Sequence, residues 1–307
     1  MITTFEELFE QLKGKGRTPV IVAGGEDIDA LQAVEQSYER GFGEAVLVGD
    51  PRKIEKSLAS FSDRRFVKDI LEAGSEEEKA HVAVEAVKHG GVLLKGTTKT
   101  SVLMKAALNK DWGLRTGSIM TSVAAYEDEQ DGQKKMILMS DGGIVVAPDL
   151  TLLLAVIDNA VGVAHKLGNS LPKVALLCAV EVVNPEMPET INAATLSKMG
   201  QLGQIKGCIV DGPFALDVAV SRYAADKKGI KSAVAGDADI LIVPNIAAGN
   251  ILGKSIEYYA HRHFAVTVAG ASAPIMVPSR ADRAESKLCS IALTILCAMQ
   301  EEVARAD

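Results

Sequence analysis

Hydrophobic residues follow two alternating patterns along this chain. Short apolar runs, as at residues 19–23, 45–48 and 92–94, alternate with longer stretches in which apolar residues recur every three or four positions. The short runs predict strands buried on both faces, and the longer stretches predict amphipathic helices. Thr4 and Ser75 each precede a glutamate by three positions, a pattern typical of a helix start. The alternation indicates a mostly parallel sheet covered by helices.

The pattern changes near residue 116. Strands with short turns are predicted at 119–125, 136–139 and 144–146, with a polar hairpin tip at 127–132. A long helix is predicted over 149–166, and alternation then returns. The further strands are predicted at 174–180, 208–210, 240–243 and 264–268, and the further helices at 27–40, 100–109, 190–202, 214–226, 248–259 and 282–303. Residues 49–51, Gly-Asp-Pro, are interpreted as the turn that closes the strand at 45–48.

The length of 307 residues favours two domains. We therefore expect two α/β domains with a cleft between them, because ligands of open α/β sheets bind at the carboxyl ends of strands. A net charge of −7 disfavours a general nucleic-acid binder, although a local basic cleft is compatible with anionic substrates. The most apolar stretch, 144–164, is interrupted by Asp149, Asp158 and Asn159, so no membrane span is expected.

Targeting and redox signals point to the cytoplasm. The first sixteen residues carry three glutamates and no apolar core, so they do not form a signal peptide. The four cysteines form no CxxC pair and match neither a zinc site nor a disulfide framework. We interpret them as reduced core residues of a cytoplasmic protein.

Four segments carry candidate chemistry. The first, residues 95–101 (KGTTKTS), follows a strand and opens a helix, so that Gly96, the hydroxyls and the helix N-terminus offer a site for an anion. A plain helix cap is the alternative for this segment. The second is Ser140-Asp141-Gly142-Gly143, for which a plain turn is an alternative. In the third, residues 244–250, Asn245, Gly249 and Asn250 are placed to donate to a carbonyl or phosphate, or to form a capped turn.

The fourth segment, residues 279–285, gathers a hydroxyl, two guanidinium groups and two carboxylates at the start of the last helix. Ser279 and Arg280 suit phosphate recognition, and Asp282 or Glu285 suits general base catalysis. The alternative is a helix cap with first-turn carboxylates. The sequence contains no GxGxxG after a strand, no GxSxG and no convincing metal-ligand spacing.

Together these segments resemble the phosphate acetyltransferase and phosphate butyryltransferase family. The matching stretches are residues 93–117, 139–150, 180–199, 212–221, 235–254 and 273–293. The resemblance implies two α/β domains with the active site between them, in a fold similar to that of isocitrate and isopropylmalate dehydrogenases. It places domain I at 1–115 plus 269–307 and domain II at 116–268, and it implies a homodimer or higher homo-oligomer through domain II.

The implied activity is reversible transfer of a short acyl group between CoA and inorganic phosphate, without a permanently bound cofactor or a metal. The NPEMP segment at 184–188 and the compact length favour the butyryl branch, and hence butyrate metabolism. A carboxylate is expected to deprotonate the CoA thiol, whose thiolate attacks the carbonyl of the acyl phosphate. The expected partners are CoA, short acyl groups and phosphate, with no nucleic acid and no membrane.

The family's residues are carried over by position. Ser279 is implied in transition-state stabilisation or thiol orientation, and Arg280 in binding phosphate or CoA. Lys105 stands where the family has an arginine, and Arg115 is a candidate to compensate for it. Ser286 stands at the spacing of the acetyl branch's catalytic aspartate, which leaves Asp282 and Glu285 as candidate bases. The further candidate binding residues are Lys95, Gly96, Thr97, Lys99, Asn245, Gly249 and Asn250.

Three other functions stay open at this point. One is a phosphate acetyltransferase. The second is a regulatory CoA-binding protein that has lost the catalytic base. The third is a metal- and NAD-dependent decarboxylating dehydrogenase on a similar fold, for which Asp141, Asp237 and Asp239 are the candidate metal ligands.

Overall fold

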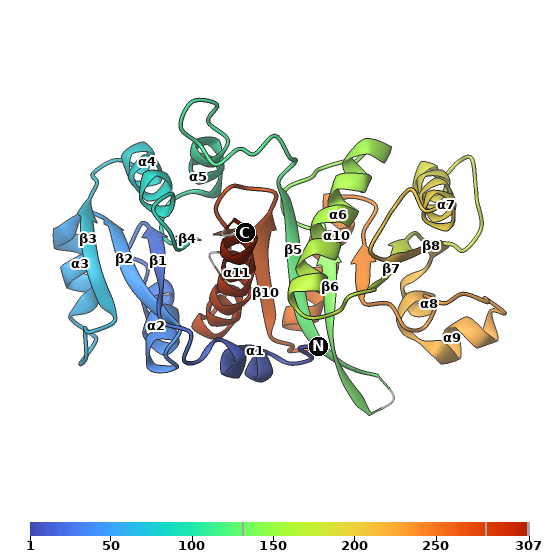
Figure 1. The fold of residues 1–307 in the computed structure, drawn as a ribbon, viewed down its shortest axis with the longest axis horizontal. Coiled ribbons are helices and arrows are strands. Elements are labelled where there is room, and N and C mark those ends of the chain that lie inside the picture. Colours follow the sequence, from blue (N-terminus) through green and yellow to red (C-terminus); the bar gives the residue numbers. More distant parts are fainter. Residues whose placement is uncertain (131, 280, 306–307) are drawn as a thin grey trace. The chain divides into compact units, whose positions relative to one another are not determined.

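The chain divides into two compact units, which the computed structural model describes for residues 1–130, 132–279 and 281–305 (Figure 1). Unit 1 comprises Met1–Thr4 and Ile119–Phe264, and unit 2 comprises Phe5–Ser118 and Ala265–Asp307. Each unit has strands and helices of its own, so the α/β class is confirmed. The domain limits inferred from the sequence remain a prediction.

The sheet of unit 2 has the strand order β3-β2-β1-β4-β11-β10. Neighbouring strands run parallel except β10, which is antiparallel to β11. Val, Ile and Leu fill β1 and β4, which are buried between helices, as the continuous apolar runs predict. The strands are β1 (Thr18–Ala23), β2 (Gly43–Gly49), β3 (Val67–Glu72), β4 (Val92–Lys95), β10 (Phe264–Ala269) and β11 (Ile275–Met276).

Helices pack along this sheet. Helix α4 packs on β1, β2 and β4, whereas α11 packs on β4, β11, α1 and α2. Local caps fix where these helices begin, since Asp27, Asp50 and Ser75 each accept a hydrogen bond from a backbone N–H of the first turn. The helices of unit 2 are α1 (Phe5–Leu12), α2 (Ile28–Glu39), α3 (Pro51–Leu58), α4 (Glu76–Val87), α5 (Thr100–Ala107) and α11 (Ala284–Arg305).

Unit 1 is built on the strand order β5-β6-β9-β7-β8, with only the β5–β6 pair antiparallel. Helix α6 packs on β5, β6 and β9, and α7 packs on β8. The strands are β5 (Thr121–Gln130), β6 (Gln133–Ser140), β7 (Lys173–Leu177), β8 (Ile209–Phe214) and β9 (Ile240–Ile242). The helices are α6 (Leu150–Lys166), α7 (Pro188–Gln201), α8 (Leu216–Val220), α9 (Arg222–Lys227) and α10 (Ile246–Tyr258).

Three local predictions are wrong. The strand predicted at 144–146 is a turn, because the Asp141 carboxylate accepts hydrogen bonds from the N–H groups of Gly143 and Ile144. The helix predicted at 214–226 is two helices, α8 and α9, divided at the extended residue Ser221, whose hydroxyl caps α9. The segment 49–51 is not only a turn, since Pro51 begins α3. Within the described residues, no helix is long and apolar enough to cross a membrane.

Candidate active site

The turn at residues 95–98 is held closely against the end of β1. Lys95 ends β4 and is 5% exposed. The N–H groups of Gly96 and Thr97 donate to the carbonyl oxygens of Ala23 and Gly24 at 2.9 and 3.0 Å. A Cβ atom at Gly96 would stand 2.2 Å from the Gly24 carbonyl oxygen, so only glycine fits there. The turn therefore has little freedom in its backbone.

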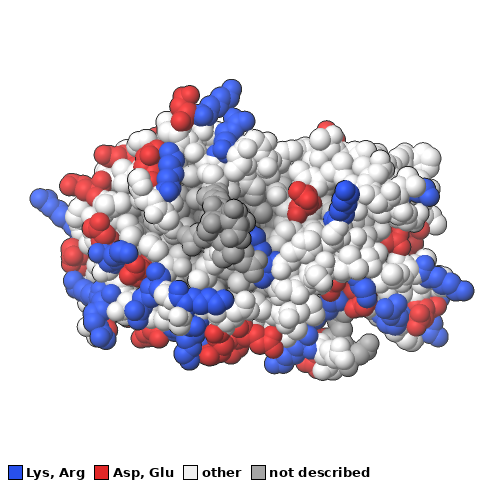
Figure 2. Space-filling model, in the orientation of Figure 1, with Lys and Arg blue, Asp and Glu red and all other residues white. Residues whose placement is uncertain are grey.

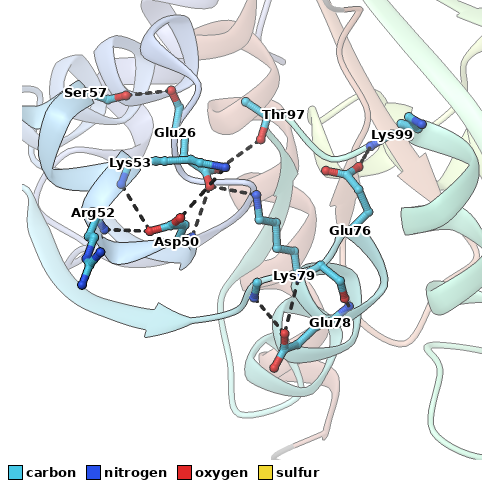
Figure 3. A network of polar contacts seen from close by, with 12 residues as sticks. Glu26, Asp50, Arg52, Lys53, Ser57, Glu76, Glu78, Lys79, Thr97 and Lys99 are labelled. Atoms are coloured by element: carbon cyan, nitrogen blue, oxygen red, sulfur yellow. Dashed lines mark hydrogen bonds and ion pairs between the residues drawn. The ribbon is translucent and has the colours of Figure 1, made fainter.

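The side chain of Glu26, directly after β1, fixes the same turn from beside it (Figure 3). The Thr97 hydroxyl donates to the Glu26 carboxylate at 3.0 Å, and the Lys79 ammonium does so at 2.8 Å. The Asp50 N–H also donates to that carboxylate, at 3.2 Å. Burial opposes ionisation of Glu26, but the hydrogen bonds from Lys79 and from the backbone outweigh it and lower its pKa. Sequence reasoning missed Glu26, whose partners are distant in the chain.

Helix α5 begins at the predicted anion site, but a protein carboxylate already uses part of it. The N–H of Lys99, the residue that caps α5, donates to the Glu76 carboxylate at 3.0 Å. The side chains of Lys99, Lys105 and Arg115 are exposed. Arg115 is paired through its backbone with Ala271. These cations are accessible to an anionic ligand, whereas the N–H of the capping residue is engaged.

The second segment of unit 2 lies at the same edge of the sheet. Met276 of β11 is paired with Leu94 of β4 in parallel register, so residues 277–279 and 96–99 both follow carboxyl ends of adjacent strands. The N–H of Ser279 donates to the Asp282 carboxylate at 2.7 Å. Asp282 is 7% exposed and thus stabilises the turn that presents Ser279. Glu285 is exposed in the first turn of α11, and Arg280 lies outside the described residues.

In unit 1, the segments at 140–143 and 245–250 lie in contact. A Cβ atom at Gly249 would stand 2.7 Å from the Cα of Gly142, so the start of α10 packs directly on the loop after β6. The side chain of Asn245 caps α10 by accepting the N–H of Ala248 at 3.0 Å. Asn245 and Asn250 are exposed. The prediction that Asn245 caps a turn is therefore confirmed. Its side-chain oxygen is used by the cap, so the amide nitrogen is the atom of this side chain that can donate to a ligand.

The three aspartates of the dehydrogenase alternative have protein partners. Asp141, 3% exposed, accepts hydrogen bonds from the backbone N–H groups of the adjoining turn, and burial nevertheless raises its pKa. Asp237 and Asp239 both pair with Lys135, the latter at 2.8 Å. No cluster of three or more metal-ligating side chains occurs in the described part of the chain. These carboxylates serve the fold.

The cysteines of unit 1 are poorly suited to be nucleophiles. Burial raises the pKa of the Cys178 thiol to about 12 and that of Cys208 to about 11. Both thiols therefore stay protonated near neutral pH, and the thiolate is the reactive form.

The face that Figure 2 draws carries charged side chains of both signs, with Lys and Arg interspersed with Asp and Glu. This distribution differs from the continuous basic surface of a nucleic-acid binder. It is compatible with a local site for a small anion.

Comparison with known proteins gives a match over most of the chain. The family model for phosphate acetyl/butaryl transferase matches residues 67–295. A Bacillus subtilis relative, named probable phosphate butyryltransferase, is 48% identical over 92% of this chain and 93% of its own length. A Thermotoga maritima phosphate acetyltransferase is 43% identical over 95% of this chain and 99% of its own. The crystal structure of a branched-chain phosphotransacylase from Enterococcus faecalis V583 has a TM-score of 0.79 at 30% identity, covering 91% of this chain and 98% of that chain.

The fold and these matches define an acyltransferase that uses CoA and phosphate. The chain belongs to the phosphate acetyl/butyryl transferase family.

Proposed function

We propose that this protein moves a short acyl group, butyryl by preference, reversibly between CoA and inorganic phosphate. The observation that carries the proposal is the nearly full-length similarity to the Bacillus subtilis relative at 48% identity. The similarity of 43% to an acetyltransferase makes acetyl the second candidate acyl group. One methylene in an apolar pocket changes the binding free energy by about 1–3 kcal/mol, so the acyl preference has to be measured.

The proposed mechanism uses the chain's own side chains. A carboxylate takes the proton of the CoA thiol, and the thiolate attacks the carbonyl carbon of the acyl phosphate, releasing phosphate and forming the thioester. The Ser279 hydroxyl stabilises the oxyanion that forms. Arg280, Lys99 and Arg115 bind the departing phosphate. The exposed side chains of Lys99 and Arg115 support this role, because an incoming anion reaches them without rearrangement.

Asp282 and Glu285 are the proposed bases, and their surroundings differ. The Asp282 carboxylate is nearly buried and accepts the Ser279 N–H, whereas Glu285 is exposed. Asp282→Asn and Glu285→Gln, separately and together, test the assignment through the pH dependence of kcat. A double variant with wild-type turnover would exclude both carboxylates as the base.

The remaining binding candidates are Lys95, Gly96, Thr97 and Lys105 in unit 2, and Asn245, Gly249 and Asn250 in unit 1. We propose to test the two sets separately. Lys105→Ala and Asn250→Ala are the conservative probes, since both side chains are exposed and their removal leaves the packing intact. A rise in the KM for butyryl-CoA or phosphate, without a change in unfolding temperature, supports contact with substrate.

The first experiment mixes the purified chain with butyryl-CoA and follows the release of free thiol, with and without phosphate, in EDTA. Phosphate-dependent release establishes the activity without an essential divalent ion. Repetition with acetyl-CoA then gives the acyl preference from the two kcat/KM values. Absence of release from folded protein with either substrate contradicts the proposal and favours a CoA-binding regulatory protein.

We also propose that the protein is a cytoplasmic homodimer whose contact lies on unit 1. The support is apolar exposure around α7: Val183 is 55% exposed, Ile191 42% and Leu202 65%. Figure 2 also shows few charged side chains over the part formed by α6 and α7. Four free cysteines fit a reducing compartment. Light scattering should give about twice the 32.4 kDa chain mass, and Ile191→Asp should return it to one chain. A wild-type monomer contradicts the dimer.

A further inference from the structure

A fully buried lysine lies behind the Ser279 turn. Lys287 follows the turn on α11 and is 1% exposed. Its ammonium lies 3.6 Å from a carboxylate oxygen of Asp27 and 3.7 Å from one of Asp29, both at the start of α2. A charged ammonium in such a place is stable only when it is paired and hydrogen-bonded. Nothing in the residue pattern of the sequence marks this lysine.

The hydrogen bond of Lys287 goes to the turn and not to the carboxylates. Its ammonium donates to the backbone carbonyl oxygen of Asp282 at 2.9 Å, whereas both carboxylate distances exceed hydrogen-bonding length. The carboxylate of the same Asp282 accepts the N–H of Ser279 at 2.7 Å. Lys287 thus contacts the backbone of the turn directly, and Asp27 and Asp29 supply the compensating negative charge.

The loop between β1 and α2 contacts the Thr97 turn directly and reaches the Ser279 turn through Lys287. Glu26 accepts the hydroxyl of Thr97, and Asp27, with Asp29 of the first turn of α2, attracts the Lys287 ammonium. Helix α11 packs directly on α2, which keeps Lys287 close to Asp27 and Asp29. The acidic residues 26, 27 and 29 are therefore linked to both turns, directly to Thr97 and through Lys287 to the turn that presents Ser279.

We infer that Lys287 is a positioning residue, which holds the Ser279 turn at a fixed place relative to the loop between β1 and α2. The inference rests on the proposed role of Ser279 in acyl transfer. A misplacement of a reacting group by about 1 Å can lower a rate on the order of 100-fold. We expect the effect on kcat and not on the KM, because Lys287 is 1% exposed and acts on the turn from within the protein.

The test compares Lys287→Met with a control on the same helix. Methionine keeps an unbranched side chain and removes the ammonium. Ile291→Ala, one turn further along α11 and also fully buried, destabilises the helix packing without removing the bond to Asp282. We expect Lys287→Met to lower kcat by about 10- to 100-fold with the KM for butyryl-CoA unchanged within about twofold. Ile291→Ala should lower the unfolding temperature and keep the wild-type kcat at 25 °C.

Other outcomes overturn the inference. The inference is wrong if the kcat of Lys287→Met lies within twofold of the wild-type value. It is also wrong if Ile291→Ala, with a similar decrease in unfolding temperature, loses as much kcat as Lys287→Met. If Lys287→Met does not fold, Lys287→Gln takes its place under the same criteria. Lys287→Arg keeps the charge and should retain more of kcat than the neutral variants; an equal loss contradicts a positioning role for the cation.

Ser279→Ala, measured in parallel, separates this inference from the proposed site. If Ser279→Ala keeps the wild-type kcat, the proposed role of Ser279 is wrong. If Ser279→Ala loses activity and Lys287→Met does not, only the role of Lys287 is wrong. The double variant should be no slower than Ser279→Ala alone, because Lys287 acts through the turn that carries the hydroxyl. Additive losses contradict that route.

Discussion

Gly249 is the position where one added methyl group tests the packing of the candidate site in unit 1. In Gly249→Ala the new Cβ stands 2.7 Å from the Cα of Gly142 and 2.9 Å from the carbonyl oxygen of Asp141. Both neighbours are backbone atoms, which cannot rotate away. Ordinary contact begins near 3.4 Å, so the start of α10 and the loop after β6 have to separate. We expect this displacement to disturb both stability and substrate binding.

The magnitude follows from two opposing contributions. Overpacking of this kind costs about 1–3 kcal/mol, whereas alanine is about 1 kcal/mol more favourable than glycine inside a helix. Gly162, in α6 of the same unit, meets nothing within 4 Å of an added Cβ and so experiences only the favourable contribution. The unfolding free energies of Gly249→Ala and Gly162→Ala should therefore differ by about 1–3 kcal/mol. The comparison cancels the helix preference, which both variants share.

The assay is urea denaturation followed by circular dichroism, together with kcat/KM for butyryl-CoA. Gly162→Ala should be as stable as wild type or more stable, with unchanged kcat/KM. Gly249→Ala should be less stable than Gly162→Ala and have a lower kcat/KM. Equal unfolding free energies in the two variants would refute the argument, because they would mean that the close backbone approach at Gly249 has no energetic consequence.

Three further predictions concern charged and sulfur side chains. Glu26→Gln leaves Lys79 buried without its partner and should cost about 3–5 kcal/mol, less when combined with Lys79→Met. Folding lowers the pKa of Glu26, so the stabilisation by its carboxylate is fully present above the ordinary pKa of 4.5 and is lost as the pH falls through the folded-state pKa. The unfolding free energy of Glu26→Gln should therefore depend less on pH in this acidic range than that of the wild type. Cys178→Ser and Cys208→Ser should keep phosphate-dependent thiol release, and intact mass after reaction with butyryl-CoA should show no acyl adduct; an adduct on either thiol contradicts direct attack. Asp237→Asn should cost at most about 1 kcal/mol, since Asp237 is partly exposed, and should leave the KM values unchanged.

Signals that lie within a few residues of each other were readable from the sequence. The capping box at Ser75 forms as predicted, with Glu78 closing it. The amphipathic helix predicted at 282–303 is present as α11, and Leu288, Ile291 and Leu296 on it are buried. That the turn at residues 95–98 follows a strand and opens a helix was also correctly predicted from the order of the hydrophobic patterns. Periodicity records which face is buried, so such features need no knowledge of distant contacts.

Features made by distant contacts were not readable. Lys79 meets Glu26 across 53 positions, and Lys287 meets Asp27 only because α11 returns to α2 at the end of the chain. No periodicity records such pairs. One error was instead a misread local signal. Asp50 followed by Pro51 is both a turn pattern and the start of a helix, and the side chain of Asp50 caps α3 here.

Two groups of ion pairs in this protein lie at opposite ends of their strands, and this difference in place separates their roles. In unit 1, Asp237 and Asp239 precede β9 and pair with Lys135 near the start of β6, at the amino ends of parallel strands. In unit 2, Glu26 and Lys79 meet where β1 and β4 end. Ligands of such sheets bind at carboxyl ends, where loops converge before the following helices. Residue type alone made Asp237 and Asp239 candidate metal ligands, whereas their place at the amino ends of strands favours a role in stability. By the same criterion Glu26, which the sequence analysis missed, lies at the carboxyl ends of strands and contacts the candidate active-site turn at Thr97.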